Sequence, residues 1–166
     1  MNRMKRLTKL TAVLISCLLI FGLTACGEPD DIDISGYQDS VITINGAGEK
    51  PVKITVANLK KMKCETVTTE STSDKIGKVR ATGPWLETVL EPYGIKQEDC
   101  KKILIKGNDL YDVKLLNSYL KEHPIMLAYG VNGEPLDKEC LPCRIIIEKS
   151  NSAYWVRQVN KITIVK

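Results

Sequence analysis

The chain has 166 residues and carries 24 basic against 20 acidic side chains, a formal charge of +4. Four of the bases and none of the acids lie in residues 1–25, so the rest of the chain has no net charge. A neutral domain lacks the basic surface with which proteins bind nucleic acid, and we expect no nucleic-acid partner. With a single histidine, His-based metal sites and a histidine-dependent catalytic triad are excluded, and we predict no metal ligands.

Residues 1–25 have the pattern of an export signal. A basic start from Arg3 to Lys9 precedes the apolar run Leu10–Ala25, which is shorter than the roughly 20 residues that cross a bilayer. The run ends in Leu-Thr-Ala-Cys26, which is typical of a bacterial lipoprotein cleavage site. We therefore predict that Cys26 carries acyl chains such as palmitate and anchors the protein at the extracytoplasmic face of the membrane. An ordinary secretory signal that happens to contain a cysteine is the alternative.

The exported part is expected to form one domain by its length. Residues 27–36 contain four acids and few apolar side chains, so residues 26–40 are predicted to be a flexible tether. The domain itself is placed at residues 41–166.

The first half of this domain is predicted to open with a hairpin. Val41–Asn45 and Val52–Val56 alternate apolar and polar residues on either side of a glycine-rich turn. Asn58 is expected to cap a short helix that runs through Met62. Two further strands are expected at 65–72 and 78–82.

A second helix is predicted to begin at Gly83-Pro84, because proline is favoured at the first position of a helix. Trp85, Leu86, Val89 and Leu90 then recur at helical spacing. Trp85 could stack on a cofactor, but a tryptophan at such spacing more often belongs to the core.

The segment 102–115 is predicted to be a hairpin with a turn at Gly107-Asn108-Asp109. Asn108, Asp109 and Tyr111 are candidate ligand-binding residues at this turn. Alternatively, the Asp109 side chain bonds its own backbone, as aspartates in turns commonly do.

Two apolar segments, Ile125–Tyr129 and Arg144–Ile147, are predicted to be buried strands. An Asn132-Gly133 turn signal follows the first strand. The remaining loop holds Cys140 and Cys143, and a polar loop carried on buried strands is a common place for a binding site.

Trp155 and Arg157 lie just before a last strand at 161–165 and would share one face if the backbone is extended there. They complete the candidate ligand-binding residues, with Cys140, Cys143 and Arg144. No catalytic residue can be assigned from the sequence.

Several motifs together resemble a known family. Residues 127–136 read Leu-Ala-Tyr-Gly-Val-Asn-Gly-Glu-Pro-Leu, and Pro142-Cys143-Arg144 precedes three isoleucines. With Gly83, Leu86 and Leu90 earlier in the chain, this order resembles the molybdopterin-binding domain of sulfite-oxidase-type oxidoreductases. The resemblance covers residues 41–165 and implies an α+β fold with mixed β-sheets and short helices. It also implies a pterin site at the segment around Arg144, with Cys140 where the family has glycine.

Catalytic members of that family hold molybdenum through a pyranopterin and one protein cysteine. The resemblance places that cysteine near Glu70–Ser73, where this chain has no thiol, and Cys64 comes too early. Serine oxygen is a harder ligand than thiolate and a poor substitute. The resemblance thus implies a molybdopterin cofactor without a cysteine ligand. We predict a membrane-anchored module that binds a small ligand or assists a redox partner.

Two alternatives remain open. One is a working molybdenum oxidoreductase that uses Cys64, Cys140 or Cys143. The other is a thiol–disulfide redox protein that uses Cys140 and Cys143, although reactive pairs usually begin a helix. Because disulfides persist in exported proteins, we predict that Cys140 or Cys143 is bonded to another cysteine.

Overall fold

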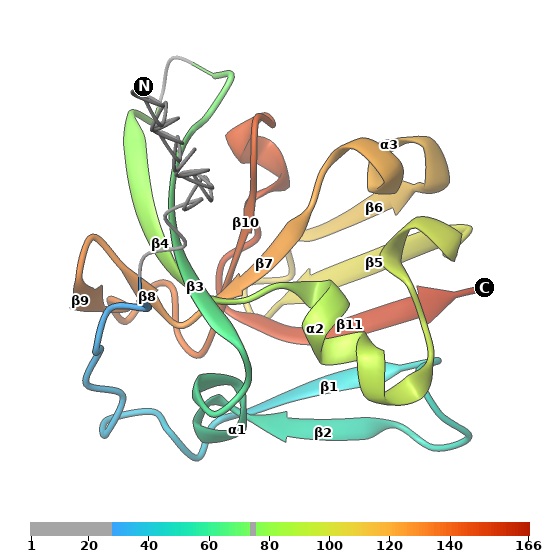
Figure 1. Ribbon diagram of the computed structural model, residues 1–166, viewed down its shortest axis with the longest axis horizontal. Coiled ribbons are helices and arrows are strands. Elements are labelled where there is room, and N and C mark those ends of the chain that lie inside the picture. The colour runs from blue at the N-terminus through green and yellow to red at the C-terminus, as the bar shows by residue number, and fades with distance from the viewer. Residues whose placement is uncertain (1–27, 74–75) are drawn as a thin grey trace, which may run out of the picture.

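The computed structural model describes residues 28–73 and 76–166, and Figure 1 shows sheets and short helices arranged around one core. Every helix in the described ranges is short, and none is long and apolar enough to cross a membrane. The strands in chain order are β1 (Val41–Asn45), β2 (Val52–Thr55), β3 (Cys64–Glu70), β4 (Lys78–Pro84), β5 (Lys102–Gly107), β6 (Asp112–Leu116), β7 (Ile125–Ala128), β8 (Gly130–Val131), β9 (Glu134–Pro135), β10 (Arg144–Ile147) and β11 (Val159–Val165). The α-helices are α1 (Val56–Lys60), α2 (Leu86–Leu90) and α3 (Asn117–Glu122), and the 3-10 turns are η1 (Glu91–Tyr93), η2 (Gln97–Asp99) and η3 (Ser152–Tyr154).

A five-stranded sheet in the order β2-β1-β11-β5-β6 forms the largest layer. The β1–β11 pair is parallel and the other pairs are antiparallel. Because side chains alternate along a strand, one face of this sheet is apolar and buried. That inner face includes Ile42, Ile44, Ile103, Ile105 and Ile162, all 0 % exposed.

The other layer combines a four-stranded sheet, β3-β4-β8-β9, with the two-stranded pair β10-β7. All four residues of β7 are buried, as are the three isoleucines of β10. Asn132 (φ 56°) and Gly133 (φ 81°) occupy the left-handed region between β8 and β9, which is the geometry of a type I′ hairpin turn. The buried strands and the turn predicted in this part of the chain are therefore confirmed.

Both helix starts differ from the prediction. Helix α1 begins at Val56, and its N-cap is Thr55 rather than Asn58. The Thr55 hydroxyl accepts from the Asn58 N–H at 3.1 Å, and Asn58 Oδ1 accepts from the Thr55 N–H at 3.1 Å. Asn58 is thus the third residue of the helix (N3) in a reciprocal capping box. A side-chain amide can fill this role as well as the N-cap role.

Gly83 and Pro84 are not helical but end strand β4, and Trp85 is the N-cap of α2. The cause is a contact made far along the chain. A Cβ atom on Gly83 would lie 2.1 Å from the carbonyl oxygen of Leu127, so only glycine allows β4 to pass this close to β7. The helix therefore starts later than the proline predicts.

The described part of the predicted tether is packed against the domain. Ile32, Ile34 and Tyr37 are 1 %, 7 % and 7 % exposed and belong to the core. Ile32 occupies the space beside Gly130, and Asp30 accepts from Arg80 at 2.6 Å. A flexible tether over 26–40 is therefore wrong from about residue 30 onward. The predicted signal and Cys26 lie outside the described residues.

Replacing Tyr37 by phenylalanine tests this packing. The Tyr37 hydroxyl donates to the Tyr129 carbonyl at 2.5 Å and accepts from the buried Leu136 N–H at 3.3 Å. Loss of the hydroxyl leaves buried groups unpaired, and we expect the free energy of unfolding to fall by about 1–3 kcal/mol. Urea denaturation measures this, with Tyr93→Phe at an exposed position as the matched control. Equal stability of the two variants would contradict the packing of this segment.

Candidate functional site

A hollow of about 410 Å³ lies where the β5–β6 turn meets the segment after β10. It is lined by Asp109, Tyr111, Ser152, Ala153, Trp155 and Arg157. Four of the ligand-binding candidates are thus brought together from two parts of the chain, namely Asp109, Tyr111, Trp155 and Arg157.

The turn is held against this segment by close backbone contacts. A Cβ atom on Gly107 would lie 2.5 Å from the Arg157 carbonyl oxygen, so only glycine allows this approach. The Asn108 N–H donates to the Gln158 carbonyl at 2.9 Å, and the Tyr111 hydroxyl donates to the Ala153 carbonyl at 2.6 Å. These bonds fix the wall of the hollow.

The side chains of the turn mainly serve the turn itself. Asp109 Oδ1 accepts from the Tyr111 N–H at 3.1 Å, and the Asn108 side chain is hydrogen-bonded to the amide of Asn160. The alternative role of Asp109, bonding to the backbone of its own turn, is therefore observed. Asp109 also borders the hollow. Asn108 is not among the lining residues and supports the turn from outside.

Trp155 is the buried aromatic residue that lines the hollow. It is 3 % exposed, and its indole N–H donates to the Ile147 carbonyl at 3.0 Å and to Ser150 Oγ at 3.2 Å. The backbone at Trp155 follows the η3 turn and is not extended (φ −86°, ψ 73°), so the condition for the expected alternation with Arg157 is not met. Trp155 is buried and Arg157 is exposed, yet both border the same hollow.

Arg144 lies against the tryptophan. Its guanidinium carbon is 5.9 Å from the centroid of the Trp155 ring, within the range of a cation–π contact. Its Nε–H is buried and has no hydrogen-bond partner among the described residues. A buried donor without a partner is costly in a native structure. Arg144 is not among the residues that line the hollow, but it contacts Trp155, which is.

Cys140 lies close enough to Arg144 and Arg157 for both positive charges to act on its pKa. Burial and a hydrogen bond to Asp137 together raise the pKa of its thiol to about 11, although the two arginines act to lower it. Complete burial also raises the pKa of Cys143. Both thiols are therefore protonated near neutral pH, unlike the thiolates of redox-active pairs.

The prediction of a disulfide at Cys140 or Cys143 is wrong for this structure, in which all four described cysteines are free. The other two thiols each donate to a nearby carbonyl of their own region, Cys64 to Leu59 at 3.2 Å and Cys100 to Lys96 at 3.3 Å. Cys143 is 0 % exposed in the core at the start of β10. Cys64 and Cys100 thus lie in other parts of the fold, whereas Cys140 and Cys143 share the loop before β10.

The segment Glu70–Ser73, near which the resemblance places a molybdenum-binding cysteine, contains the buried Ser71. This side chain follows β3, is 8 % exposed, and accepts from the Ser152 N–H at 2.8 Å and the Ser73 N–H at 3.0 Å. Since Ser152 lines the hollow, the end of β3 lies at its edge, whereas Cys64 is at the opposite end of β3. The described residues contain no group of three or more His, Cys, Asp or Glu side chains placed to hold a metal ion.

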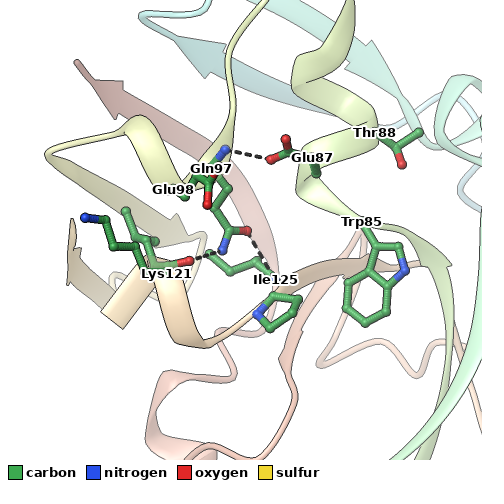
Figure 2. Close-up of a pocket in the computed structure, with 9 residues that line it drawn as sticks. Trp85, Glu87, Thr88, Gln97, Glu98, Lys121 and Ile125 are labelled. Atoms are coloured by element: carbon green, nitrogen blue, oxygen red, sulfur yellow. Dashed lines mark hydrogen bonds between the residues drawn. The ribbon is translucent and has the colours of Figure 1, made fainter. Parts of the chain in front are cut away.

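A second hollow of about 430 Å³ was not predicted from the sequence (Figure 2). Gln97 lies at its centre, donating its side-chain amide to the Leu120 carbonyl at 2.7 Å and accepting from the Ile125 N–H at 3.2 Å. Its backbone N–H donates to Glu87 at 2.6 Å, and the Trp85 indole donates to Glu65 at 2.9 Å. These polar groups already have partners within the protein, so we assign this hollow a structural role.

The sequence profile of the oxidoreductase molybdopterin binding domain matches residues 29–166. The chain belongs to this family. The match begins before the predicted boundary at residue 41, in agreement with the packed residues after Asp30. The resemblance inferred from the motifs and the α+β fold with mixed sheets and short helices are confirmed.

Among solved structures, the fold is similar to that of the sulfane dehydrogenase SoxCD from Paracoccus pantotrophus. The TM-score is 0.62 at 24 % sequence identity, over 77 % of this chain and 38 % of that chain. The chain therefore spans well under half of that protein's length, and at this identity the likeness shows the fold alone. No curated protein sequence matches the chain.

The pKa of Cys140 leads to a prediction on its reactivity. Because only the thiolate is alkylated and burial raises this pKa to about 11, the rate with iodoacetamide should keep rising up to about pH 11 in the folded protein. In denaturant the rate should level off above about pH 8.5, the ordinary range of a thiol. Peptide mass spectrometry across a pH series measures both rates. A rate in the folded protein that levels off below neutral pH would support the thiol–disulfide alternative instead.

Proposed function

We propose that this protein is a lipid-anchored, extracytoplasmic module that binds a pterin-type ligand without cysteine-held molybdenum and assists a redox partner. The observation that carries this proposal is Ser71. It lies in the segment where the resemblance places the family's cysteine, it is bonded to Ser152 of the hollow, and its oxygen already accepts two backbone N–H groups.

The side chains around the hollow suit the organic part of such a cofactor. Arg144 offers a buried N–H without a partner, and its guanidinium lies over the Trp155 ring. Arg157 is half exposed, and its one ion pair, to the exposed Glu139 at 3.4 Å, contributes little. Its planar guanidinium is free to bind a phosphate in a bidentate manner. A pterin bearing a phosphate fits these donors.

The residues do not fit molybdenum held by a protein thiolate. An oxygen ligand from Ser71 would be hard and weakly acidic, and it would have to give up the hydrogen bonds that position Ser152. The best thiol for the alternative of a working molybdenum enzyme is Cys140, which is near both arginines. The thiol–disulfide alternative receives no support from two thiols whose pKa values are raised.

Metal analysis of the protein purified from its native host tests the cofactor proposal. We expect well under one molybdenum atom per chain, because the described residues near the hollow lack a suited thiolate. Extraction and fluorescence of oxidised pterin, measured on the same sample, report the organic ligand separately. Arg144→Gln should lower the pterin content, whereas Arg80→Gln, at an arginine bonded to Asp30 away from the hollow, should not.

Near-stoichiometric molybdenum that disappears in Cys140→Ser would overturn this proposal and establish the molybdenum enzyme. Absence of pterin from the wild type, with molybdenum also absent, would leave the hollow to a different small ligand and contradict the pterin assignment.

The anchoring part of the proposal rests on the sequence around Cys26 and on the packed residues that follow it. The Asp30 N–H already donates to Thr66 Oγ1 at 2.9 Å, so only a few residues separate Cys26 from the folded domain. At about 3.5 Å for each extended residue, the domain would stay within roughly 15 Å of the anchor. An acylated Cys26 would therefore hold the domain directly at the lipid surface.

Replacing Cys26 by serine should move the protein from the membrane fraction to the soluble fraction, because the acyl chains provide the attachment. Fractionation of cells followed by immunoblotting measures the distribution, and Ser35→Ala, a change at an exposed residue of the domain, serves as the control. A Cys26→Ser protein that remains entirely membrane-bound would disprove the lipid anchor.

A further inference from the structure

The outer face of the five-stranded sheet carries an unbalanced group of lysines. The strand register places Lys53, Thr43, Lys161, Lys106 and Asp112 directly opposite one another in one row across β2, β1, β11, β5 and β6. Directly paired residues in a sheet project on the same side, so three ammonium groups share this row with one carboxylate.

The neighbouring rows extend the same pattern. Lys114 lies opposite Leu104, and Lys102 lies opposite both Leu116 and Val165. Asp112 is the only acid that the register places in these three rows. We call this surface the lysine face, defined by Lys53, Lys102, Lys106, Lys114 and Lys161.

The charge of the lysine face is not compensated within the described part of the chain. The ion pairs found there involve Lys60, Arg80 and Arg157, and none involves a lysine of this face. Lys161 and Lys106 are directly opposite each other, an arrangement of like charges that weakens a sheet. Because the chain after residue 25 has no net charge, the excess of bases on this face is balanced by acids on other surfaces.

The shape of the face suits an anionic surface rather than a buried ion. A hollow of about 430 Å³ opens between Lys53, Lys106 and Lys161, and Asn160 and Thr43 also line it. Val41 and Leu116 are 43 % and 52 % exposed on the same side. In Figure 1 the strands lie side by side, with α2 on their core side, where its buried residues join the core.

The composition distinguishes lipid from protein as the partner. Docking surfaces for proteins are rich in tryptophan, tyrosine and arginine and poor in lysine. The lysine face has no aromatic residue and no arginine in its paired rows. Lysine side chains can rest their apolar stems at an interface while the ammonium groups contact headgroups. Each lysine near an anionic leaflet strengthens binding by about fivefold.

We propose that the lysine face docks on the anionic phospholipid headgroups of the membrane to which the protein is anchored. The inference rests on the proposed anchor at Cys26 for its location, and it adds the orientation of the domain. With this face toward the lipid, the sheet lies along the bilayer surface.

Lysine footprinting of the lipidated chain tests this orientation. The protein is reconstituted into vesicles of phosphatidylcholine alone and into vesicles with about a third phosphatidylglycerol. Brief acetylation followed by mass spectrometry gives a rate for each lysine. We expect acetylation of Lys53, Lys106 and Lys161 to be several-fold slower in the anionic vesicles. Lys96 and Lys121, which lie outside the sheet, should react equally in both.

Salt and a matched pair of variants sharpen the test. Protection should disappear at about 1 M salt, where the screening length is only about 3 Å. The triple variant Lys53→Gln, Lys106→Gln, Lys161→Gln should lose protection at Lys102 and Lys114. The control Lys96→Gln, Lys121→Gln, Lys149→Gln removes the same amount of charge elsewhere. This variant should keep the protection at Lys102 and Lys114. The sheet variant removes only exposed like charges, so we expect it to fold.

Equal rates in both vesicles for an acylated chain would overturn the lysine face as a lipid surface. Protection seen in native membranes but not in anionic vesicles would assign the face to another partner and also overturn the proposal. The mass of the N-terminal peptide reports acylation of Cys26 independently. An unacylated chain whose face is still protected would refute the anchor and uphold the face.

Discussion

The approach of the β5–β6 turn to the backbone at Arg157 is the constraint on which the candidate site depends. Gly107 allows the two backbones to meet at a distance that a Cβ atom would prevent. The Asn108–Gln158 and Tyr111–Ala153 hydrogen bonds then lock the turn in place. Without this contact Asp109 and Tyr111 would have no fixed relation to Trp155, and the hollow would lose one wall.

The same contact connects the site with the largest sheet. Strand β11 begins two residues after Arg157 and lies at the centre of the five strands, between β1 and β5. The segment that lines the hollow thus continues directly into the most enclosed strand of the sheet. Because β11 is paired on both sides, displacing Arg157 would disturb a strand with no free edge. A rigid element therefore positions the half-exposed guanidinium.

Local patterns in the sequence were sufficient for the longer strands. Alternation identifies β1 and β2, and the continuous apolar runs identify β7 and β10, because burial on one or both faces leaves a direct mark on composition. The start of α2 could not be found in this way. Gly83 is fixed by the carbonyl of Leu127, which is remote in sequence, and proline at the next position gave a misleading local signal.

The packed segment after Asp30 was missed for a related reason. Its acids dominate the composition, but Ile32 and Ile34 alternate with them and turn inward, with Ile32 beside Gly130. In the site, the grouping of Trp155 with Arg157 depended on an η3 turn that no pattern in the sequence announced. The sequence named residues of both parts of the hollow as candidates, but only the fold brings the two parts together.

The Ser71 hydroxyl has a structural role that a thiol would fill less well. A cysteine side chain at that position would be a weak hydrogen-bond acceptor, whereas the serine oxygen accepts strongly from the N–H groups of Ser152 and Ser73. The loop between β10 and β11 is therefore tied to the end of β3 by direct bonds. The two hydrogen bonds to Ser71 therefore hold Ser152, and with it this side of the hollow, against the end of β3.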